Sequence, residues 1–312
     1  MRILFTGASS FTGFHFVNAL AAAGHEVICP LRGTIAAYNG IRRVRVERLQ
    51  PVARLVEGIT FGAKAFLKLV RESGPLDLLC HHAADVHNYK SPDFDPIRAL
   101  ENNTKELPAV LSTFKQTAGK AVVLTGTLFE PDEGKGDQAL SAFSPYALSK
   151  WLTWQIFRYY CETAHVPLGK FVLPNPFGPW EEPRFTSYLM TTWKSGKTAE
   201  VRTPSYVRDN CHVSLLALAY VAFADRVAVL ENGWTKTNPS GYVETQGAFT
   251  ARVAREVSSR TKWPCAFELL KQEDFSEPLV RSNEEPAASG FPQWSESSAW
   301  DEFVGFYQHA LS

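Results

Sequence analysis

The chain has 312 residues, of which 32 are basic and 32 acidic, so its formal net charge is zero. A chain without excess positive charge lacks the electrostatic footprint of a nucleic-acid-binding protein, and we expect no nucleic-acid partner. The five cysteines are scattered and form no Cys-x-x-Cys pair, which indicates neither a disulfide framework nor a zinc site and favours reduced thiols in a cytoplasmic protein.

Strands and helices alternate along the first half of the chain. A strand over 2–6, a helix over 14–23 and a strand over 26–31 make the crossover unit of a parallel sheet. Further strands are expected over 44–49, 76–80, 121–124 and 168–173, and further helices over 63–72, 97–114 and 145–163. This alternation predicts an α/β fold with a doubly wound parallel sheet of the Rossmann type.

The pattern changes around Asn175, where four prolines between 174 and 183 break regular structure. Shorter elements follow, with helices expected over 248–259 and 300–310. We expect this part to form a smaller C-terminal lid domain at the carboxyl edge of the sheet.

Neither a targeting segment, a membrane span nor a metal site is expected. The first residues lead directly into a strand, which is not typical of a signal peptide. The longest apolar run, over 215–230, is interrupted by Asp225 and Arg226 and is too short for a span of about 20 apolar residues. No cluster of His, Asp and Glu shows metal-ligand spacing.

Gly7, Ser10 and Gly13 follow the first strand and open the first helix. Glycine lets the backbone turn tightly toward a pyrophosphate, and the helix N-terminus directs N–H groups and a positive dipole at it. The strand–turn–helix context favours a dinucleotide site over a glycine-rich turn without a ligand. Ser10 stands where glycine is more usual, and its hydroxyl can bond a phosphate oxygen.

The end of the second strand predicts which ribose is bound. An acidic residue there favours NAD, but this chain has Leu31 and Arg32. A guanidinium pairs well with a 2′-phosphate, so NADP is our first choice and NAD the second; the alternative is that Arg32 is a solvated loop cation. We interpret a nearby basic cluster as a solvated strand edge rather than a second phosphate clamp. It consists of Arg42, Arg43, Arg45 and Arg48.

Tyr146 and Lys150 lie four residues apart in a predicted helix and share one face of it. A nearby ammonium lowers the pKa of a phenol from about 10, so Tyr146 can exchange a proton with a carbinol or carbonyl near neutral pH. Thr127 follows the fifth strand, at the edge where ligands bind in this fold class, and can bond the reacting oxygen. Alone, a Tyr-x-x-x-Lys pair is most often part of an ordinary amphipathic helix; behind a dinucleotide turn it predicts proton transfer coupled to hydride transfer. Asn102, or its neighbour Asn103, is expected to fix a bound water or a backbone carbonyl.

Several segments together match one family, in family order. They are 6–13, 81–84, Asn102, Thr127, 146–150, 175–179 and 208–213, and they span about two-thirds of the chain. On these residues the chain resembles the extended short-chain dehydrogenase/reductases, in the group of nucleotide-sugar epimerases, dehydratases and reductases. The first turn is shared with many enzymes, whereas the full series is far more specific.

The resemblance implies that Thr127, Tyr146 and Lys150 form a catalytic triad. It implies cofactor contacts from Gly7, Ser9, Ser10, Phe11, Gly13, Arg32, His82, Ala83, Ala84, Asn102, Tyr146, Lys150 and Pro174. It implies a nucleoside-diphosphate sugar as substrate, with contacts from Asn175 and from Arg208, which would pair with the diphosphate. Further candidate substrate contacts are His87, Thr127, Glu182 and Phe185. Residues 1–174, rejoined by 206–240, would form the dinucleotide domain, and 175–205 with 241–312 the substrate domain.

Departures from the family pattern narrow the expected activity. Family dehydratases carry an Asp-Glu pair after the catalytic threonine, whereas this chain has Leu128 and Phe129, so a 4,6-dehydratase is not expected. Glu130 follows and is expected to point elsewhere. A common aspartate is replaced at Ser214, and a common arginine at Val172, which changes the expected sugar contacts.

We therefore expect a cytoplasmic 4-epimerase or 4-ketoreductase, dimeric by analogy through the helices after the fourth and fifth strands. A second hypothesis is reduction of a non-sugar ketone, as in flavonoid-type reductases, which also favour an arginine after the second strand. A third is a non-catalytic cofactor-binding scaffold or sensor. His87 is either a second acid/base or an exposed loop histidine. Glu181 and Glu182 either bond sugar hydroxyls or cap a turn.

Overall fold

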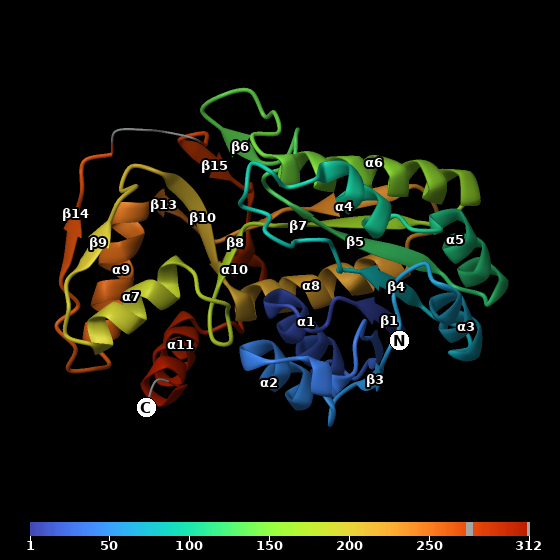
Figure 1. The fold of residues 1–312 in the computed structure, drawn as a ribbon, viewed down its shortest axis with the longest axis horizontal. Coiled ribbons are helices and arrows are strands. Elements are labelled where there is room, and N and C mark those ends of the chain that lie inside the picture. The colour runs from blue at the N-terminus through green and yellow to red at the C-terminus, as the bar shows by residue number, and fades with distance from the viewer. Residues whose placement is uncertain (273–276, 311–312) are drawn as a thin grey trace. The chain divides into compact units, whose positions relative to one another are not determined.

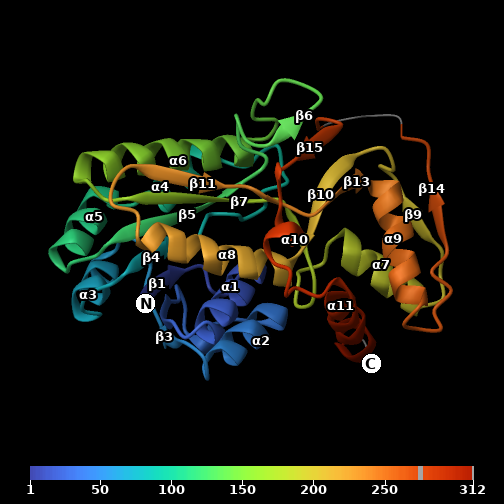
Figure 2. The ribbon, with the colours of Figure 1, turned by 180° about the vertical axis from the view of Figure 1, so that it is seen from behind.

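A computed structural model describes residues 1–272 and 277–310. The chain divides into two compact units. The first, which we call the Rossmann unit, comprises residues 1–133, 141–173 and 217–238. The second, which we call the smaller unit, comprises residues 134–140, 174–216 and 239–312. Figures 1 and 2 show their elements from opposite sides.

The Rossmann unit is built on a seven-stranded parallel sheet with the order β11-β7-β5-β4-β1-β2-β3. Its strands are β1 (Arg2–Thr6), β2 (Glu26–Pro30), β3 (Arg54–Val56), β4 (Leu78–His81), β5 (Ala121–Thr127), β7 (Leu168–Leu173) and β11 (Trp234–Thr237). The central strands are buried along nearly their whole length, as expected of a parallel sheet covered on both faces. The predicted Rossmann-type α/β fold is thus confirmed.

Helices cover both faces of this sheet (Figures 1 and 2). They are α1 (Phe11–Ala22), α2 (Gly40–Leu49), α3 (Lys64–Glu72), α4 (Pro96–Asn103), α5 (Leu107–Gln116), α6 (Pro145–Ala164) and α8 (Val213–Ala228). On one face, α3, α5 and α6 contribute Phe66, Phe114 and Phe157 to a shared core. On the other, α1 and α8 meet where the rings of Phe16 and Tyr220 stack at 4.2 Å. The loops that follow the parallel strands therefore gather at the carboxyl edge of the sheet.

The strand predicted over 44–49 is wrong, because these residues lie in α2 and the third strand is β3. Apolar and charged residues alternate there, as in a half-buried strand. However, Val46 and Leu49 lie three residues apart and are both buried on one helix face. The arginine cluster therefore lies on a helix rather than a strand edge; Arg43 and Arg48 are exposed as expected, whereas Arg45 is fully buried.

The single helix predicted over 97–114 is two helices, α4 and α5. Glu106, between them, has a φ of 51°, which a continuous helix does not allow. Pro108 suits the first turn of a new helix, where its missing N–H costs nothing. Helix α1 begins at Phe11 rather than at residue 14, because Ser10 caps it.

The smaller unit contains a sheet with the order β13-β10-β15-β6, with β8 paired to β10, and two two-stranded sheets, β12-β16 and β14-β9. The strands are β6 (Lys135–Gly136), β8 (Asn175–Phe177), β9 (Ala199–Val201), β10 (Val207–His212), β12 (Pro239–Ser240), β13 (Tyr242–Thr245), β14 (Phe267–Leu269), β15 (Val280–Ser282) and β16 (Glu285–Pro286). The helices are α7 (Phe185–Lys194), α9 (Gln246–Ser258), α10 (Ala287–Gly290) and α11 (Glu296–Ala310). Their core is aromatic and includes Trp193, Trp300 and Phe303.

The division differs from the predicted domains chiefly at two segments, besides the boundary residues 174 and 239–240. Residues 206–216 belong to the smaller unit, since β10 pairs with β8, β13 and β15; the chain returns to the Rossmann unit only at residue 217, within α8. Residues 134–140 also belong to the smaller unit, since β6 pairs with β15.

Across residues 1–272 and 277–310, we find no helix with the length and apolar character needed to cross a membrane. Within the same residues, no group of three or more His, Cys, Asp and Glu side chains could hold a metal ion. The five cysteines are buried and free.

Candidate active site

The loop between β1 and α1 is a tight turn that depends on two glycines. Gly7 has a φ of 82°, and a Cβ there would lie 2.7 Å from the backbone nitrogen of Ala83. A Cβ on Gly13 would lie 2.3 Å from the carbonyl oxygen of Gly7. The two glycines therefore allow β1, α1 and the loop after β4 to approach closely. Ser9 is half-buried and Phe11 buried beside this turn.

Ser10 is the N-cap of α1. Its hydroxyl accepts a hydrogen bond from Gly13 N–H at 3.1 Å and donates one to Gly7 O at 2.8 Å. Because its one hydrogen is already donated to Gly7, the predicted bond from this hydroxyl to a phosphate oxygen does not fit the structure. A phosphate at this turn would instead meet backbone N–H groups and the positive end of the helix dipole.

His82 lies beneath the turn and links several elements. Its ring nitrogens are 2.9 Å from Thr125 Oγ1, 3.0 Å from Thr12 Oγ1 and 3.2 Å from Ser10 Oγ. Burial, and then the charge of Lys150, lowers the pKa of His82 to about 3, so the ring is neutral at physiological pH. His82 thus positions the predicted cofactor loop from within. Ala83 and Ala84 follow it and are half-buried.

Arg32 lies two residues after the end of β2 and is exposed. The structure adds a carboxylate that sequence reasoning missed: Glu57, directly after β3, accepts the Ile35 N–H at 2.6 Å. Glu57 is distant in sequence, but β2 and β3 are neighbours in the sheet. Both a guanidinium and a carboxylate are therefore available where the second and third strands end.

Of the two asparagines that end α4, Asn103 is buried and Asn102 is exposed. Asn103 accepts the Asp85 N–H through Oδ1 at 2.7 Å, donates to Thr153 Oγ1 at 3.3 Å, and its carbonyl lies 3.1 Å from His81 Nε2. Asn102 donates to the Asp85 carboxylate at 2.9 Å. Asn103 is therefore the residue that fixes the loop after β4.

Lys150 and Thr127 lie where α6 meets the end of β5. Lys150 is buried and its Nζ donates to Thr125 O at 2.6 Å. Burial lowers the pKa of Lys150 to about 8; the Glu130 carboxylate opposes this shift and the Lys170 ammonium adds to it. Thr127 is the last residue of β5, and its hydroxyl accepts the Phe129 N–H at 3.4 Å. That hydroxyl can still donate its own hydrogen.

Tyr146 lies in the first turn of α6, one turn before Lys150. The helix begins with Pro145 after Ser144, whose hydroxyl accepts the Ala147 N–H at 3.1 Å. The ring of Tyr146 is half-buried, 5.1 Å from the ring of Tyr89. A strong local start signal therefore fixes the residue that would carry the proton.

Sequence reasoning missed a buried ion cluster behind Thr127. Lys170 Nζ donates to Glu130 Oε2 at 2.5 Å and to Glu133 Oε1 at 2.7 Å. Glu130 was expected to point elsewhere; its Oε1 accepts the Thr127 N–H at 2.8 Å. The available signal was Lys170 itself, because a lysine inside an apolar strand requires a buried carboxylate partner.

Three predicted residues lie near strands of the smaller unit. Pro174 is buried, and Asn175 begins β8 and is the register partner of Asn210 in β10. Arg208, in β10, is buried; its Nη2 donates to Glu277 at 2.8 Å and its Nη1 to Val207 O at 3.0 Å. The guanidinium predicted to pair with a diphosphate is therefore already bound to a carboxylate.

Glu181 and Glu182 have different surroundings. Glu181 is buried and accepts hydrogen bonds from Thr186 Oγ1 at 2.5 Å and from the Tyr307 hydroxyl at 2.8 Å. Burial raises the pKa of Glu181 to about 7, against the lowering effect of these two bonds. Glu181 is thus held inside the smaller unit, whereas Glu182 is half-buried.

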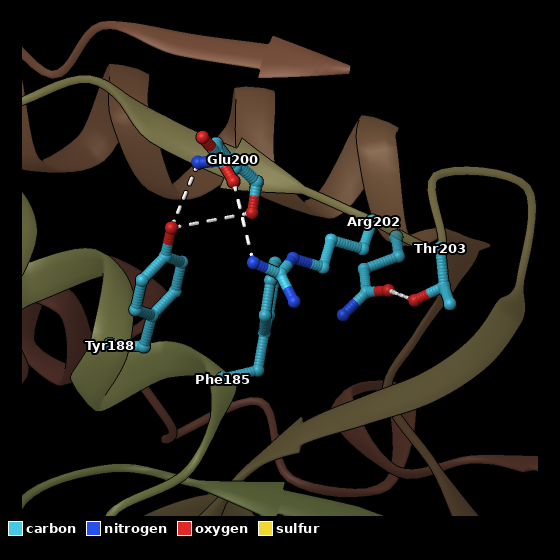
Figure 3. Close-up of a pocket in the computed structure, with 6 residues that line it drawn as sticks. Phe185, Tyr188, Glu200, Arg202 and Thr203 are labelled. Atoms are coloured by element: carbon cyan, nitrogen blue, oxygen red, sulfur yellow. Dashed lines mark hydrogen bonds and ion pairs between the residues drawn. The ribbon is translucent and has the colours of Figure 1, made fainter. Parts of the chain in front are cut away.

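A pocket of about 250 Å³ in the smaller unit contains Phe185 (Figure 3). It is lined by Phe185, Tyr188, Glu200, Arg202, Thr203 and Gln246. The Tyr188 hydroxyl accepts the Glu200 N–H at 2.8 Å, and Arg202 lies 3.6 Å from the Glu200 carboxylate. Two aromatic rings and a guanidinium suit the binding of a planar polar ring.

His87, another residue predicted to contact substrate, lies exposed on the loop after β4.

Comparisons with known proteins agree with this fold. A model of the NAD dependent epimerase/dehydratase family matches residues 3–257. UDP-glucose 4-epimerase from Thermotoga maritima, solved with UDP-glucose, is 17% identical over 100% of each chain, with a TM-score of 0.73. UDP-glucuronic acid 4-epimerase from Bacillus cereus, solved with UDP-glucuronic acid and NAD, is 17% identical over 99% of this chain and 100% of that one, with a TM-score of 0.74. dTDP-glucose 4,6-dehydratase from Streptomyces venezuelae, solved with NAD, is 21% identical over 99% of this chain and 97% of that one, with a TM-score of 0.73.

A search of curated proteins found no match. At these identities the solved structures show a shared fold, whereas the family model covers well over half of the chain. It confirms the resemblance to the extended short-chain dehydrogenase/reductases that the motifs predicted. The chain therefore belongs to the NAD dependent epimerase/dehydratase family, a family of nucleotide-sugar enzymes that depend on a nicotinamide cofactor.

Proposed function

We propose that this chain is an NAD(P)-dependent oxidoreductase that acts at C4 of a nucleoside-diphosphate sugar, as a 4-epimerase or a 4-ketoreductase. The observation that carries the proposal is the 2.6 Å bond from Lys150 Nζ to Thr125 O, which fixes α6 against the end of β5. It places the helix turn that bears Tyr146 beside the strand that ends at Thr127. Tyr146, one turn before Lys150, and Thr127, at the end of β5, would then supply a phenol and a hydroxyl near this ammonium.

The turn between β1 and α1 fits the pyrophosphate of a dinucleotide. Its glycines let the backbone pack closely, and the first turn of α1 has no acidic residue to repel a phosphate. The family match supports a nicotinamide cofactor here. When bound, NAD(P) would accept or donate the hydride.

The chemical roles of the three residues follow from their charge and donor capacity. The pKa of Lys150 is about 8, so the ammonium is mostly charged at pH 7 and favours the phenolate of Tyr146. Tyr146 would take the proton from the C4 hydroxyl, or return it to the C4 carbonyl. Thr127 would donate its hydroxyl hydrogen to the same oxygen and orient it. Leu128 and Phe129 offer no second acid or base, which favours C4 chemistry over 4,6-dehydration.

We propose NADP as the first choice of cofactor and NAD as the second. The exposed guanidinium of Arg32 suits a 2′-phosphate, whereas Glu57 nearby is a carboxylate able to bond ribose hydroxyls. Isothermal titration should find that Arg32→Ala weakens NADP binding about tenfold and leaves NAD binding unchanged. Equal weakening of both cofactors would remove the argument for NADP.

We propose that the smaller unit binds the substrate through Asn175, Glu182, Phe185 and Arg208. The pocket at Phe185 suits a nucleobase, and solved relatives of the same fold contain UDP-glucose or UDP-glucuronic acid. For Arg208 to reach a diphosphate, Glu277 must release it, since the two are 2.8 Å apart. We also propose a homodimer through α4 and α6, where Ile97 and Tyr159 are 58% and 62% exposed.

The proposal is tested with dialysed protein and a panel of UDP- and dTDP-sugars. Release of a nucleotide on denaturation identifies a retained cofactor, as an epimerase requires, whereas stoichiometric consumption of added NADPH identifies a reductase. Tyr146→Phe should lower kcat about 1,000-fold. Tyr159→Phe, an exposed tyrosine on the same helix, is the matched control. A Tyr146→Phe variant with full turnover would exclude the proposed chemistry and favour a binding scaffold.

One observation favours a second candidate, the reduction of a non-sugar ketone. Arg208 is engaged by Glu277 and by backbone carbonyls, so the expected diphosphate contact is not preformed. If no nucleoside diphosphate raises the melting temperature while NADPH does, this candidate is preferred. If UDP raises it, and Arg208→Ala abolishes the increase, the sugar-nucleotide proposal is preferred.

A further inference from the structure

The ion cluster behind Thr127 consists of Lys170, Glu130, Glu133 and Lys236, all in the Rossmann unit. Lys170 and Glu130 are buried completely or nearly so, at 1% and 0% side-chain exposure. Glu133 is buried too, and its second oxygen accepts from Lys236 Nζ at 2.9 Å. The cluster therefore runs from a partly exposed lysine in the edge strand β11 to a fully buried one in β7.

Stability alone does not explain such a cluster. Taking charges out of water is costly, and replacing a buried ion pair by apolar residues of similar size is often neutral or stabilising. Lys170 lies in β7 between Leu124 of β5 and Lys236 of β11, and its neighbours along β7, Gly169 and Phe171, are apolar. Apolar residues in place of the whole cluster would therefore be expected to cost little stability, so the charges need another reason.

The contacts of Glu130 supply one. Its Oε1 accepts the Thr127 N–H at 2.8 Å, and its own N–H donates to Thr127 O at 3.1 Å, so the two residues are bonded in both directions. Gly126 leaves room for this arrangement: a Cβ there would lie 2.9 Å from Glu130 Oε1 and 2.7 Å from Lys170 Cε. Lys170 Nζ also lies 4.9 Å from the ring of Trp154, one turn after Lys150 on α6.

We propose that Glu130 is a positioning residue, whose carboxylate fixes Thr127 at the end of β5 and is itself held in place by Lys170. This inference rests on the proposed function for its consequence, because only an enzyme that uses Thr127 needs that residue fixed. Glu130 does not touch the reacting atoms; it acts through the backbone of Thr127.

A carboxylate is required because two donors meet Glu130 from different sides. One oxygen accepts from the Thr127 amide and the other from the Lys170 ammonium. A glutamine has one oxygen and one amino group, so it satisfies one donor and opposes the other. Glu130→Gln should therefore displace Thr127 or leave it loosely held, although the change in shape is small.

Glu133 provides a matched control. It is nearly as buried as Glu130 and bonds the same lysine, but its carboxylate bonds Lys170 and Lys236 rather than Thr127. Glu133→Gln should cost similar stability in urea unfolding and keep the wild-type kcat. Glu130→Gln should lower kcat about 100-fold with little change in the KM for substrate and cofactor, the expected result of a misplaced reacting group.

A double variant tests the geometry directly. In Glu130→Gln combined with Lys170→Met, the ammonium is gone and the amide oxygen can accept the Thr127 N–H. This double variant should recover most of the kcat that Glu130→Gln loses, which general damage to the fold would not allow. Loss of kcat that is equal in Glu130→Gln and Glu133→Gln, or no recovery in the double variant, would overturn the inference.

A readout without turnover separates this inference from the proposed function. In protein labelled with 15N-threonine, the NMR resonance of the Thr127 amide is assigned as the one that is absent in Thr127→Ser. This resonance should shift in Glu130→Gln and keep its position in Glu133→Gln. If wild-type protein turns over no sugar nucleotide, the proposed function fails, and the amide resonance still decides the positioning. If the Thr127 resonance does not move in Glu130→Gln, the proposed positioning role of Glu130 is wrong.

Discussion

Each unit of this protein buries a glutamate, and the two are satisfied differently. Glu130 in the Rossmann unit bonds the Lys170 ammonium at 2.5 Å. Glu181 in the smaller unit has two hydroxyl donors, from Thr186 and Tyr307, and Arg184 affects it only as a nearby charge. The difference shows that burial of a carboxyl group can be offset either by a cation or by protonation.

The two solutions have different consequences for pH. At Glu130, the bonded ammonium of Lys170 offsets the burial of the charge. A carboxyl group bonded mainly to hydroxyls instead has a raised pKa, about 7 for Glu181, and changes its charge in that range. The contribution of Glu181 to the stability of the smaller unit should therefore depend on pH in that range.

The largest expected effect comes from Lys170→Met. It leaves Glu130 and Glu133 buried without the ammonium between them, which should lower the free energy of unfolding by about 3–5 kcal/mol at pH 7. Urea unfolding measures this loss. Lys135→Met, which removes an exposed lysine paired with Glu284 at 3.5 Å, is the control and should change little. If Lys170→Met loses as little stability as the control, the ammonium does not offset the burial of Glu130, and the contrast with Glu181 is wrong.

A pH-dependent effect is expected at Glu181. Its folded pKa of about 7 lies above the ordinary value of 4.5, so the folded protein binds more protons between these values. The contribution of Glu181 to the free energy of unfolding should therefore fall as pH rises from about 4.5 to about 7, and Glu181→Gln should remove about 2–3 kcal/mol of this dependence. Urea unfolding of both proteins at pH 5 and pH 8 measures it, with Glu182→Gln as the neighbouring control.

Tyr307→Phe should have a smaller effect on the same group. It removes the hydroxyl that donates to Glu181 at 2.8 Å, so the free energy of unfolding should fall by about 1 kcal/mol. The loss should be larger at pH 8, where the carboxylate needs the donor more, than at pH 5. Equal losses at both pH values would mean that the Tyr307 hydroxyl does not preferentially stabilise the charged carboxylate of Glu181.

The smallest effect is expected from Lys236→Met, at the outer end of the ion cluster. Lys236 bonds Glu133 at 2.9 Å, but its side chain is 34% exposed, so solvent screens the pair. The free energy of unfolding should fall by only about 0.5 kcal/mol, and by less in 1 M salt. A loss near that of Lys170→Met would show that the two lysines are equivalent, contrary to their burial.

Much of the Rossmann unit could be predicted because its signals are local. The glycine turn, the alternation of elements and the Tyr-x-x-x-Lys spacing lie within short segments of sequence. The strand predicted over 44–49 was wrong because charged and apolar residues alternate there by chance, while packing selects the helix. The break between α4 and α5 depends on one residue, Glu106, whose backbone conformation has no sequence signal of its own.

The candidate site was less predictable, because its supporting contacts join distant residues. In sequence, Lys170 is 40 residues from Glu130, and Glu57 is 22 residues from Ile35, whose amide donates a hydrogen bond to it. Ser10 was expected to bond a phosphate, but the cap of α1 uses the same hydroxyl. The residue types indicated which chemical groups were present. Which hydrogen-bond partner each group takes is seen only in the folded structure.

Gly126 carries a consequence for mutational tolerance. Its backbone has the ordinary extended conformation of β5, which any residue can adopt, and lysine side chains usually move aside for a new methyl group. Here the ion pair immobilises the atoms that would have to move. A saturation library at position 126 should accept glycine alone in the natural background, yet accept alanine once Glu130 and Lys170 are both made apolar.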